Sequence, residues 1–324
     1  MSASAPSNQA LPLAGVPAGM GGSGGRRKPA VPGARPMRES VAGLVLIAPV
    51  LLVFAVSVVY PLFDTIRISF YDIKGLSPAR YVGVGNYLKL FADQAFRNTI
   101  WTTVIWTVCT TVISVGIGWL LAMLCSFAPK STLPFRVMIF AAFGISEAVS
   151  GFMWLGIFRP DQSGLLNALL AAVGLGQFQH AWLGDPNTAL WGLIVAASWA
   201  QVGLPLMLCF ASVQSIPGNV LEAAAMDGAG PWSMMRYIMM PLSMPGVRVA
   251  VFINLLGSLR AFDIIYVLTG GGPVRSTETI GFFMYRESMT QFKLGYGAAA
   301  TVILLVAVFV ISAPAIIQRT AGAR

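Results

Sequence analysis

The sequence predicts an all-α integral membrane protein with about six transmembrane helices. Hydrophobic residues make up 56% of its 324 residues and charged residues only 10%, whereas soluble domains carry roughly 25% charged residues. The mean hydropathy is +0.74. Six separate apolar stretches are each long enough to cross a bilayer, which takes about 20 residues. These predicted spans are 41–63, 100–127, 136–158, 190–213, 247–269 and 298–317.

The segment before the first span, residues 1–38, is rich in Ser, Gly, Pro and Ala, a composition that predicts disorder. Basic residues gather at its end and predict a cytoplasmic tail. The first apolar run begins too late and is too long for a cleaved signal peptide. Six spans then place both termini in the cytoplasm, together with the loop 214–246, and make 39–324 one transmembrane domain. The basic residues are Arg26, Arg27, Lys28, Arg35 and Arg38.

Several kinds of chemistry are excluded by residue type. Cys109, Cys125 and Cys209 fall inside predicted spans without CxxC spacing, so they are expected to be packing residues. A single histidine, His180, rules out paired-histidine metal sites. The sequence has no Gly-Lys dipeptide and therefore no phosphate-binding P-loop. We expect no catalytic residue, no metal and no cofactor on this chain, and no nucleic-acid binding, because the basic residues serve topology.

The loop 214–246 has its own local pattern. Pro217 can begin a short helix that runs through a series of alanines, and Gly228 can end it, because glycine enters the left-handed conformation without steric cost. A second helix can start at Pro231, and Pro241 and Pro245 break it before the fifth span. Two short helices are therefore predicted to meet at a bend. Composition alone also allows a simple solvated connector.

This loop resembles the EAA loop of the membrane subunits of bacterial binding-protein-dependent ABC importers. Farther along, the segment from Phe262 to Pro273, which ends in Thr-Gly-Gly-Gly-Pro, resembles the sugar-importer permeases of the maltose-transporter class, and the first of their two unlike permeases in particular. The resemblance covers most of the chain after the N-terminal tail. The residues that match the EAA loop are Pro217, Glu222, Ala223, Ala224, Asp227, Gly228, Ala229, Trp232, Ile238, Pro241 and Pro245.

The resemblance implies a permease subunit of an ATP-driven importer in the bacterial cytoplasmic membrane. Its implied partners are a second homologous permease, an ATPase dimer that holds ATP and Mg²⁺, and an extracytoplasmic binding protein that delivers a sugar or related polyol. An importer of glycerol-3-phosphate or a glycerophosphodiester with the same architecture is an alternative. So is an ion-coupled secondary transporter, although the sequence shows no convincing inverted repeat.

The same resemblance implies which loop residues couple to the ATPase. Glu222 is expected to face basic or donor groups in a groove of the ATPase, and Gly228 to form the bend. Met235 stands where the family usually has Phe, and is expected to enter a pocket of the partner. The implied coupling residues are Glu222, Ala223, Ala224, Asp227, Gly228, Ala229, Trp232, Met235 and Pro241.

Polar residues inside spans mark the candidate substrate pathway, because they are costly in a bilayer. Asn254, Ser258 and Phe262 follow one another at helical spacing, so they predict either a sugar-binding stripe or a helix-packing face. Arg260 and Asp263 lie three residues apart and can also pair on one helix face. The complete set of pathway candidates is Glu147, Trp154, Asn254, Ser258, Arg260, Phe262 and Asp263.

Overall fold

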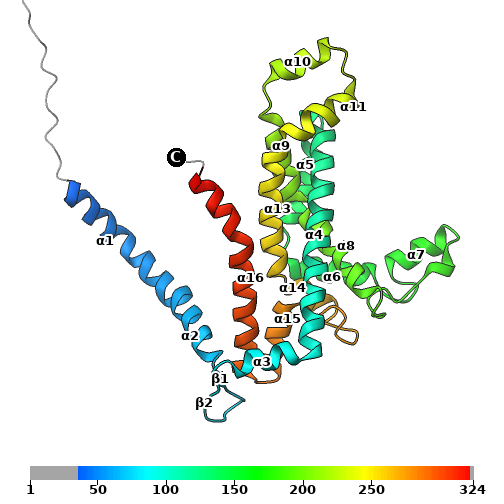
Figure 1. Ribbon diagram of the computed structural model, residues 1–324. Coiled ribbons are helices and arrows are strands. Elements are labelled where there is room, and N and C mark those ends of the chain that lie inside the picture. The colour runs from blue at the N-terminus through cyan, green and yellow to red at the C-terminus, as the bar shows by residue number, and fades with distance from the viewer. Residues whose placement is uncertain (1–35, 322–324) are drawn as a thin grey trace, which may run out of the picture. The chain divides into compact units, whose positions relative to one another are not determined.

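The computed structural model describes the backbone of residues 36–321 and the side chains of residues 44–313. Most of the predicted disordered tail, 1–35, lies outside the described residues. Helix α1 begins at Pro36, so the last three residues of the predicted tail are helical. The described part of the chain is mostly helical, as the composition predicts (Figure 1).

The described part of the chain divides into two compact units, residues 36–57 and 58–321. The first span corresponds to the helical stretch Leu44–Ile68, which ends five residues later than the predicted 41–63. A proline at position 49 and a π-helical turn are accommodated along it without ending the helix. The elements of this stretch are α1 (Pro36–Phe54), η1 (Ala55–Val59) and α2 (Tyr60–Ile68).

The spans of the second unit are of two kinds. Two are single long helices, and three consist of helix pairs bent by 100°, 46° and 62°. Together with the first span, Leu44–Ile68, the described residues contain three unbroken spans. The number rises to six when each bent pair is counted as one span, in agreement with the six apolar stretches. The unbroken helices are α4 (Gln94–Ser126) and α16 (Leu294–Ala321). The bent pairs are α5 (Leu133–Phe143) with α6 (Glu147–Ile157), α8 (Ala189–Gln201) with α9 (Gly203–Gln214), and Pro231–Leu242 with α13 (Met244–Leu259).

The fifth span differs from its prediction. Residues 247–269 are not one helix, because α13 ends at Leu259 and a separate helix, α14 (Asp263–Leu268), follows. The backbone N–H groups of Arg260 and Ala261 bond to carbonyls three residues back, which tightens the last turn and ends the helix. Hydropathy does not detect this break, since the residues on both sides are apolar.

The bundle is held together by close helix contacts. Helix α4 packs against α8, α9 and α13. A Cβ at Gly118 would lie 2.7 Å from the Pro205 Cβ and 2.8 Å from the Leu206 backbone nitrogen, so only glycine permits this approach. Small residues commonly provide such contacts between membrane helices. Trp106 and Ile265, neither exposed at all, belong to the largest apolar cluster.

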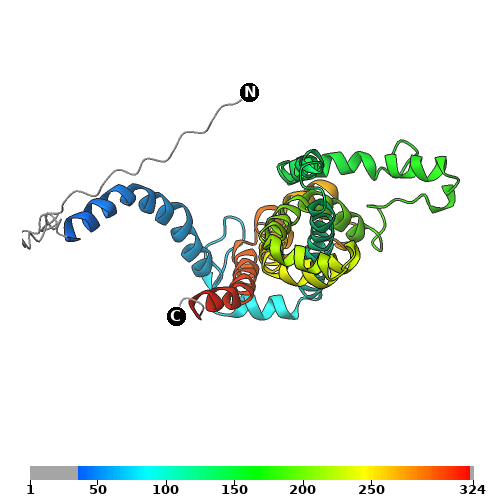
Figure 2. The same ribbon diagram turned by 90° about the horizontal axis from the view of Figure 1, so that it is seen from above.

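The two ends of the bundle carry different structures. At one end, α10 and α11 form the loop between the fourth and fifth spans; at the opposite end lie α3, a small hairpin and α15 (Figure 1). Helix α7 extends sideways from the bundle when it is viewed from above (Figure 2). The bounds are α3 (Gly85–Ala92), β1 (Tyr71–Asp72) paired antiparallel with β2 (Arg80–Tyr81), α7 (Leu165–Ala172), η2 (Gly176–Phe178), α10 (Gly218–Met226), α11 (Pro231–Met234), η3 (Met235–Met239), α12 (Met240–Leu242), α15 (Ile280–Tyr285) and η4 (Arg286–Thr290).

Candidate functional site

The loop between the fourth and fifth spans has the predicted bend. Helix α10 ends at Met226, and Gly228 follows with a φ of +81°. The Gly228 N–H bonds to the Ala225 carbonyl at 3.1 Å, and the Ala229 N–H bonds to the Ala224 carbonyl at 3.0 Å. This pair of bonds is the Schellman arrangement that ends many helices. The predicted end of the first loop helix at Gly228 is therefore confirmed.

Much of the loop surface is available to a partner. Glu222, Ala223, Asp227 and Pro241 are exposed, and Trp232 is 66% exposed. None of the ion pairs among the described residues involves Glu222. The loop thus presents two exposed carboxylates, Glu222 and Asp227, and neither forms an ion pair among the described residues.

Two of the predicted coupling residues face inward instead. Ala224 is buried, and Met235 is only 4% exposed. Met235 packs with Met123, Val213 and Met239 in a cluster of its own chain. In this structure Met235 is therefore not exposed to a partner, and its entry into a partner's pocket stays a prediction. Its contacts with this apolar cluster of its own bundle account for the burial.

Three helix breaks bring three polar side chains together. Glu147 is the first residue of α6, Gln201 the last of α8, and Asp263 the first of α14. Gln201 and Asp263 both lie near enough to the Glu147 carboxyl to influence it electrostatically. Four residues farther along both helices, a Cβ at Gly151 would lie 3.0 Å from the Val267 Cβ, so α6 and α14 run side by side.

The polar residues of α13 lie inside the bundle. Asn254 is 5% exposed and Ser258 is 1% exposed. The Asn254 Oδ1 and the Ser258 Oγ have no hydrogen-bond partner among the described residues. Arg260 is exposed and its Nε donates to the Leu256 carbonyl at 3.4 Å. Arg260 takes part in none of the ion pairs found among the described residues. The pairing with Asp263 that helical spacing allowed therefore does not form, because the break between α13 and α14 separates the two side chains.

The two aromatic candidates have different surroundings. Trp154 packs against Phe158 and Trp199, with ring centroids 5.1 and 6.0 Å away, and lies half-buried against the largest apolar cluster. Phe262 lies in the helix break and therefore does not continue the stripe of Asn254 and Ser258 on one helix. The Phe262 ring lies 5.0 Å from the Tyr285 ring.

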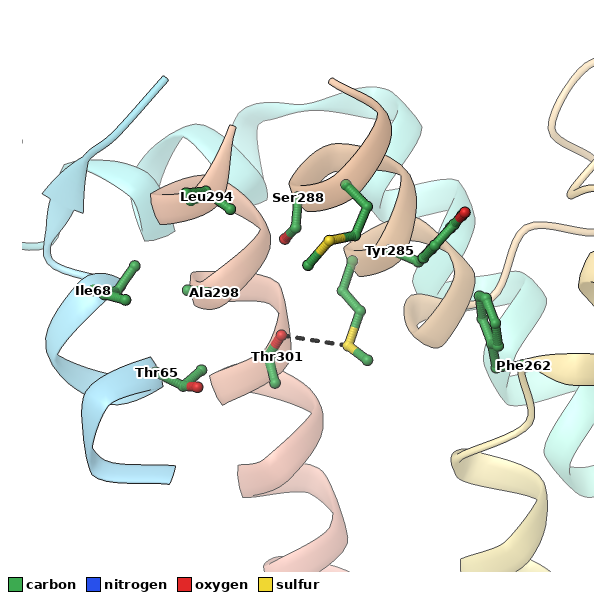
Figure 3. A pocket seen from close by; sticks show the side chains of 10 residues that line it. Thr65, Ile68, Phe262, Tyr285, Ser288, Leu294, Ala298 and Thr301 are labelled. Atoms are coloured by element: carbon green, nitrogen blue, oxygen red, sulfur yellow. Dashed lines mark hydrogen bonds between the residues drawn. The ribbon is translucent and has the colours of Figure 1, made fainter. Parts of the chain in front are cut away.

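Phe262 also borders a cavity of about 390 Å³ between α2, α15, η4 and α16 (Figure 3). Phe262 and Tyr285 line it on one side, and Thr65 of α2 lies on the other. A hydrogen bond from the Thr301 hydroxyl to the Met284 sulfur, 3.3 Å long, crosses one wall. Gln201 and Tyr285 were not among the predicted pathway residues. Gln201 is a polar residue inside a predicted span and was recognisable by the criterion that selected Glu147.

Comparison with known proteins decides the family. Residues 114–321 match the family described as the inner membrane component of binding-protein-dependent transport systems. The chain belongs to this family. The match contains both the coupling loop and the predicted pathway residues. This permease is 36% identical to a probable ABC transporter permease of Bacillus subtilis, YurN, over 79% of this chain and 88% of the relative.

Other similar permeases have named substrates. The sn-glycerol-3-phosphate permease UgpA of Agrobacterium fabrum is 32% identical, with 75% of this chain and 81% of UgpA covered. The sulfoquinovosyl glycerol permease SmoG of the same organism is 28% identical, with 82% and 86% covered. A bacterial alginate ABC transporter, crystallised with its alginate-bound periplasmic protein, has the same fold, with a TM-score of 0.74, 20% identity, and 85% of this chain and 92% of that chain covered.

These findings establish the general class. The chain is a multi-pass permease subunit of a binding-protein-dependent ABC importer. It is a transport subunit. The match to a family of binding-protein-dependent systems argues against the ion-coupled secondary transporter that the sequence left open.

Proposed function

We propose that this permease is the first of two unlike membrane subunits in an importer of a neutral sugar or polyol. An extracytoplasmic binding protein delivers the solute, and an ATPase dimer that holds ATP and Mg²⁺ drives transport. Both termini and the loop 214–246 lie in the cytoplasm. The exposed coupling loop supports the ATPase partner, and the convergence of Glu147, Gln201 and Asp263 supports the substrate class.

The coupling loop receives the force of ATP binding. Glu222 pairs with a basic or donor group in a groove of the ATPase, and Ala223 allows the two backbones to approach closely. The bend at Gly228 fixes the direction of α10 relative to α11. When the ATPase closes, α10 moves with it and carries the cytoplasmic ends of the spans.

Replacing Glu222 by Ala tests this coupling. Removing one partner of a buried ion pair costs about 3 to 5 kcal/mol, so we expect the variant to insert and assemble but to lose stimulation of ATP hydrolysis by the loaded binding protein. The measurement uses the complete complex in vesicles, with Asp161→Asn in an exposed extracytoplasmic loop as the control. Wild-type stimulation in Glu222→Ala would contradict the assigned role.

The substrate class follows from the charges near the helix breaks. Glu147 and Asp263 supply carboxyl groups, and Gln201 an amide, all of which hydrogen-bond well to hydroxyl groups. Each ionised carboxylate repels a phosphate: two like charges 4 Å apart interact with about 4 kcal/mol at an effective dielectric constant of about 20. Arg260 is the basic residue nearest to Asp263 in the sequence, but it forms no ion pair with Asp263 and so does not neutralise its charge. This arrangement favours a neutral polyhydroxyl solute.

Glycerol-3-phosphate remains the second candidate because of the similarity to UgpA at 32% identity. A thermal-shift screen of the cognate binding protein separates the two. We expect stabilisation by neutral sugars or polyols and none by glycerol-3-phosphate. A binding protein that responds only to glycerol-3-phosphate would overturn the neutral substrate, while leaving the assignment as an importer permease intact.

A further inference from the structure

Two tryptophans of α4 connect this helix to α13. The indole N–H of Trp119 donates to the Ser243 hydroxyl at 3.0 Å, and the indole N–H of Trp106 donates to the Ser258 carbonyl at 3.1 Å. The later tryptophan, Trp119, contacts the earlier serine, Ser243, so α4 and α13 are antiparallel. The rise of an α-helix places the two bonds roughly 20 Å apart along α4. Together they fix the register of the helix pair.

The Trp119 bond lies at the base of the coupling loop. Ser243 occupies the 62° bend between the loop and α13, and none of its surface is exposed. Its hydroxyl also donates to the Met240 carbonyl at 3.0 Å, and its carbonyl accepts from the Ser212 hydroxyl of α9 at 3.2 Å. The Ser243 side chain thus joins α4 to the bend, and the Ser243 carbonyl joins α9 to the same place.

The Trp106 bond lies at the other end of α13. The Ser258 carbonyl belongs to the last turn of α13, directly before the break that leads to Phe262 and Asp263. Trp106 is completely buried in the apolar cluster around that break. Any movement of α13 relative to α4 would therefore have to break this hydrogen bond inside a packed core.

Helix α4 is well suited to transmit movement. It runs for 33 residues without a break, whereas three neighbouring spans are bent pairs. Beyond Trp106 it continues to α15, where the Ile280 N–H donates to the Thr103 hydroxyl at 2.9 Å. The Thr103 bond lies within one turn of Trp106, so α4 is bonded to α15 and α13 at nearly the same level and to the base of the coupling loop at Trp119. An unbroken helix bonded in this way moves as one body with the elements bonded to it.

We propose that Trp119 and Trp106 are positioning residues that make α4 and α13 move together, so that displacement of the coupling loop reaches the helix break before Asp263. This role rests on the proposed function, because it requires a partner ATPase that moves the loop. Without the indole N–H groups, the loop can move while α13 slips against α4. ATP is then hydrolysed with less solute transported.

The test compares Trp119→Phe and Trp106→Phe in the reconstituted complex. Phenylalanine keeps an aromatic ring and removes the N–H donor. We expect solute uptake per ATP hydrolysed to fall roughly two- to tenfold, the range that the net loss of one hydrogen bond produces, while ATP hydrolysis continues. Trp101→Phe is the matched control, because Trp101 lies on the same helix and is 66% exposed. Its ratio should equal that of the wild type.

A double-mutant cycle with Ser243→Ala identifies the hydrogen bond as the cause. If the bond transmits the movement, Trp119→Phe combined with Ser243→Ala has no larger effect than either change alone. If Trp119→Phe fails to assemble, Ser243→Ala alone must lower the ratio. An unchanged ratio in the assembled variants, or equal losses of uptake and ATP hydrolysis, would overturn the inference. A wild-type complex that shows no ATP hydrolysis on addition of loaded binding protein would instead overturn the proposed function.

Discussion

At the scale of single residues, the coupling loop depends on one backbone conformation. Gly228 adopts a φ of +81°, and a Cβ there would meet no atom within 4 Å. The need for glycine is therefore purely conformational, since other residues rarely adopt positive φ. Gly230, two residues later, is equally uncrowded but has a φ of −70°.

This difference gives a direct comparison of two glycines. We expect Gly228→Ala to strain the bend by roughly 1 to 2 kcal/mol and to lower solute uptake and the ATP hydrolysis stimulated by loaded binding protein. Gly230→Ala should leave both unchanged. Both variants are measured in the reconstituted complex. Equal behaviour of the two would show that the left-handed conformation at Gly228 is not required.

A second residue-scale feature is the loop around Asp185. The Asn187 backbone N–H donates to the Asp185 carboxylate at 2.8 Å and holds the pKa of this carboxyl below its usual range. The opposite oxygen of the carboxylate lies 2.9 Å from the His180 ring. A depressed pKa stabilises the folded loop at pH values above the ordinary pKa of Asp, about 3.9.

The loop should therefore loosen on acidification. As the pH falls below about 4 and then through the depressed pKa, protonation of Asp185 removes its hydrogen bonds. Hydrogen exchange of the Asn187 amide, corrected for its intrinsic pH dependence, should show falling protection in this range. Asp185→Asn should remove the dependence on pH. Protection that stays constant down to the lowest pH would contradict the assignment.

At the scale of elements, the bent spans depend on close backbone approach. A Cβ at Gly203, the first residue of α9, would lie 2.8 Å from the Ile139 carbonyl oxygen and from the Phe140 Cα of α5. Backbone atoms cannot move aside as a side chain can. The bend between α8 and α9 thus brings α9 against α5, and glycine is the residue that permits it.

Gly203→Ala should destabilise the bundle by about 1 to 3 kcal/mol, the usual cost of overpacking. Gly116→Ala is the control, because Gly116 also lies in a span but a Cβ added there would have no atom within 4 Å. Thermal unfolding of the detergent-solubilised complex measures the effect. A melting temperature for Gly203→Ala equal to that of Gly116→Ala would show that the contact relaxes at no cost.

At the scale of the whole molecule, this permease is one part of an assembly. It belongs to a family of inner membrane components of binding-protein-dependent systems, and its sequence has no P-loop with which to hydrolyse nucleotide. We expect separate subunits to supply solute binding and ATP hydrolysis. The exposed coupling loop is the surface through which we expect the ATPase to act.

Affinity purification of the tagged chain from its native membrane tests this assembly. We expect an ATPase subunit and a second, different permease to co-purify. The chain expressed alone should hydrolyse no ATP. A stable complex of identical copies of this permease with an ATPase, and no second permease, would contradict the heterodimer while keeping the importer.

Local sequence patterns were sufficient to predict the class of fold, six apolar stretches and a polar loop whose first helix ends at Gly228. Each of these depends on properties of neighbouring residues: hydropathy sums over a short window, and the glycine signal acts within one turn. The resemblance of the loop supplied the family, which the comparison confirmed.

The positions of the bends and the meetings of distant side chains became visible only in three dimensions. Met235 faces its own bundle because it packs there against Met123, Val213 and Met239. Glu147, Gln201 and Asp263 come together from three spans because each lies at a helix break. Breaks and contacts of this kind depend on hydrogen bonds and packing between residues far apart in the chain, and hydropathy contains no information about them.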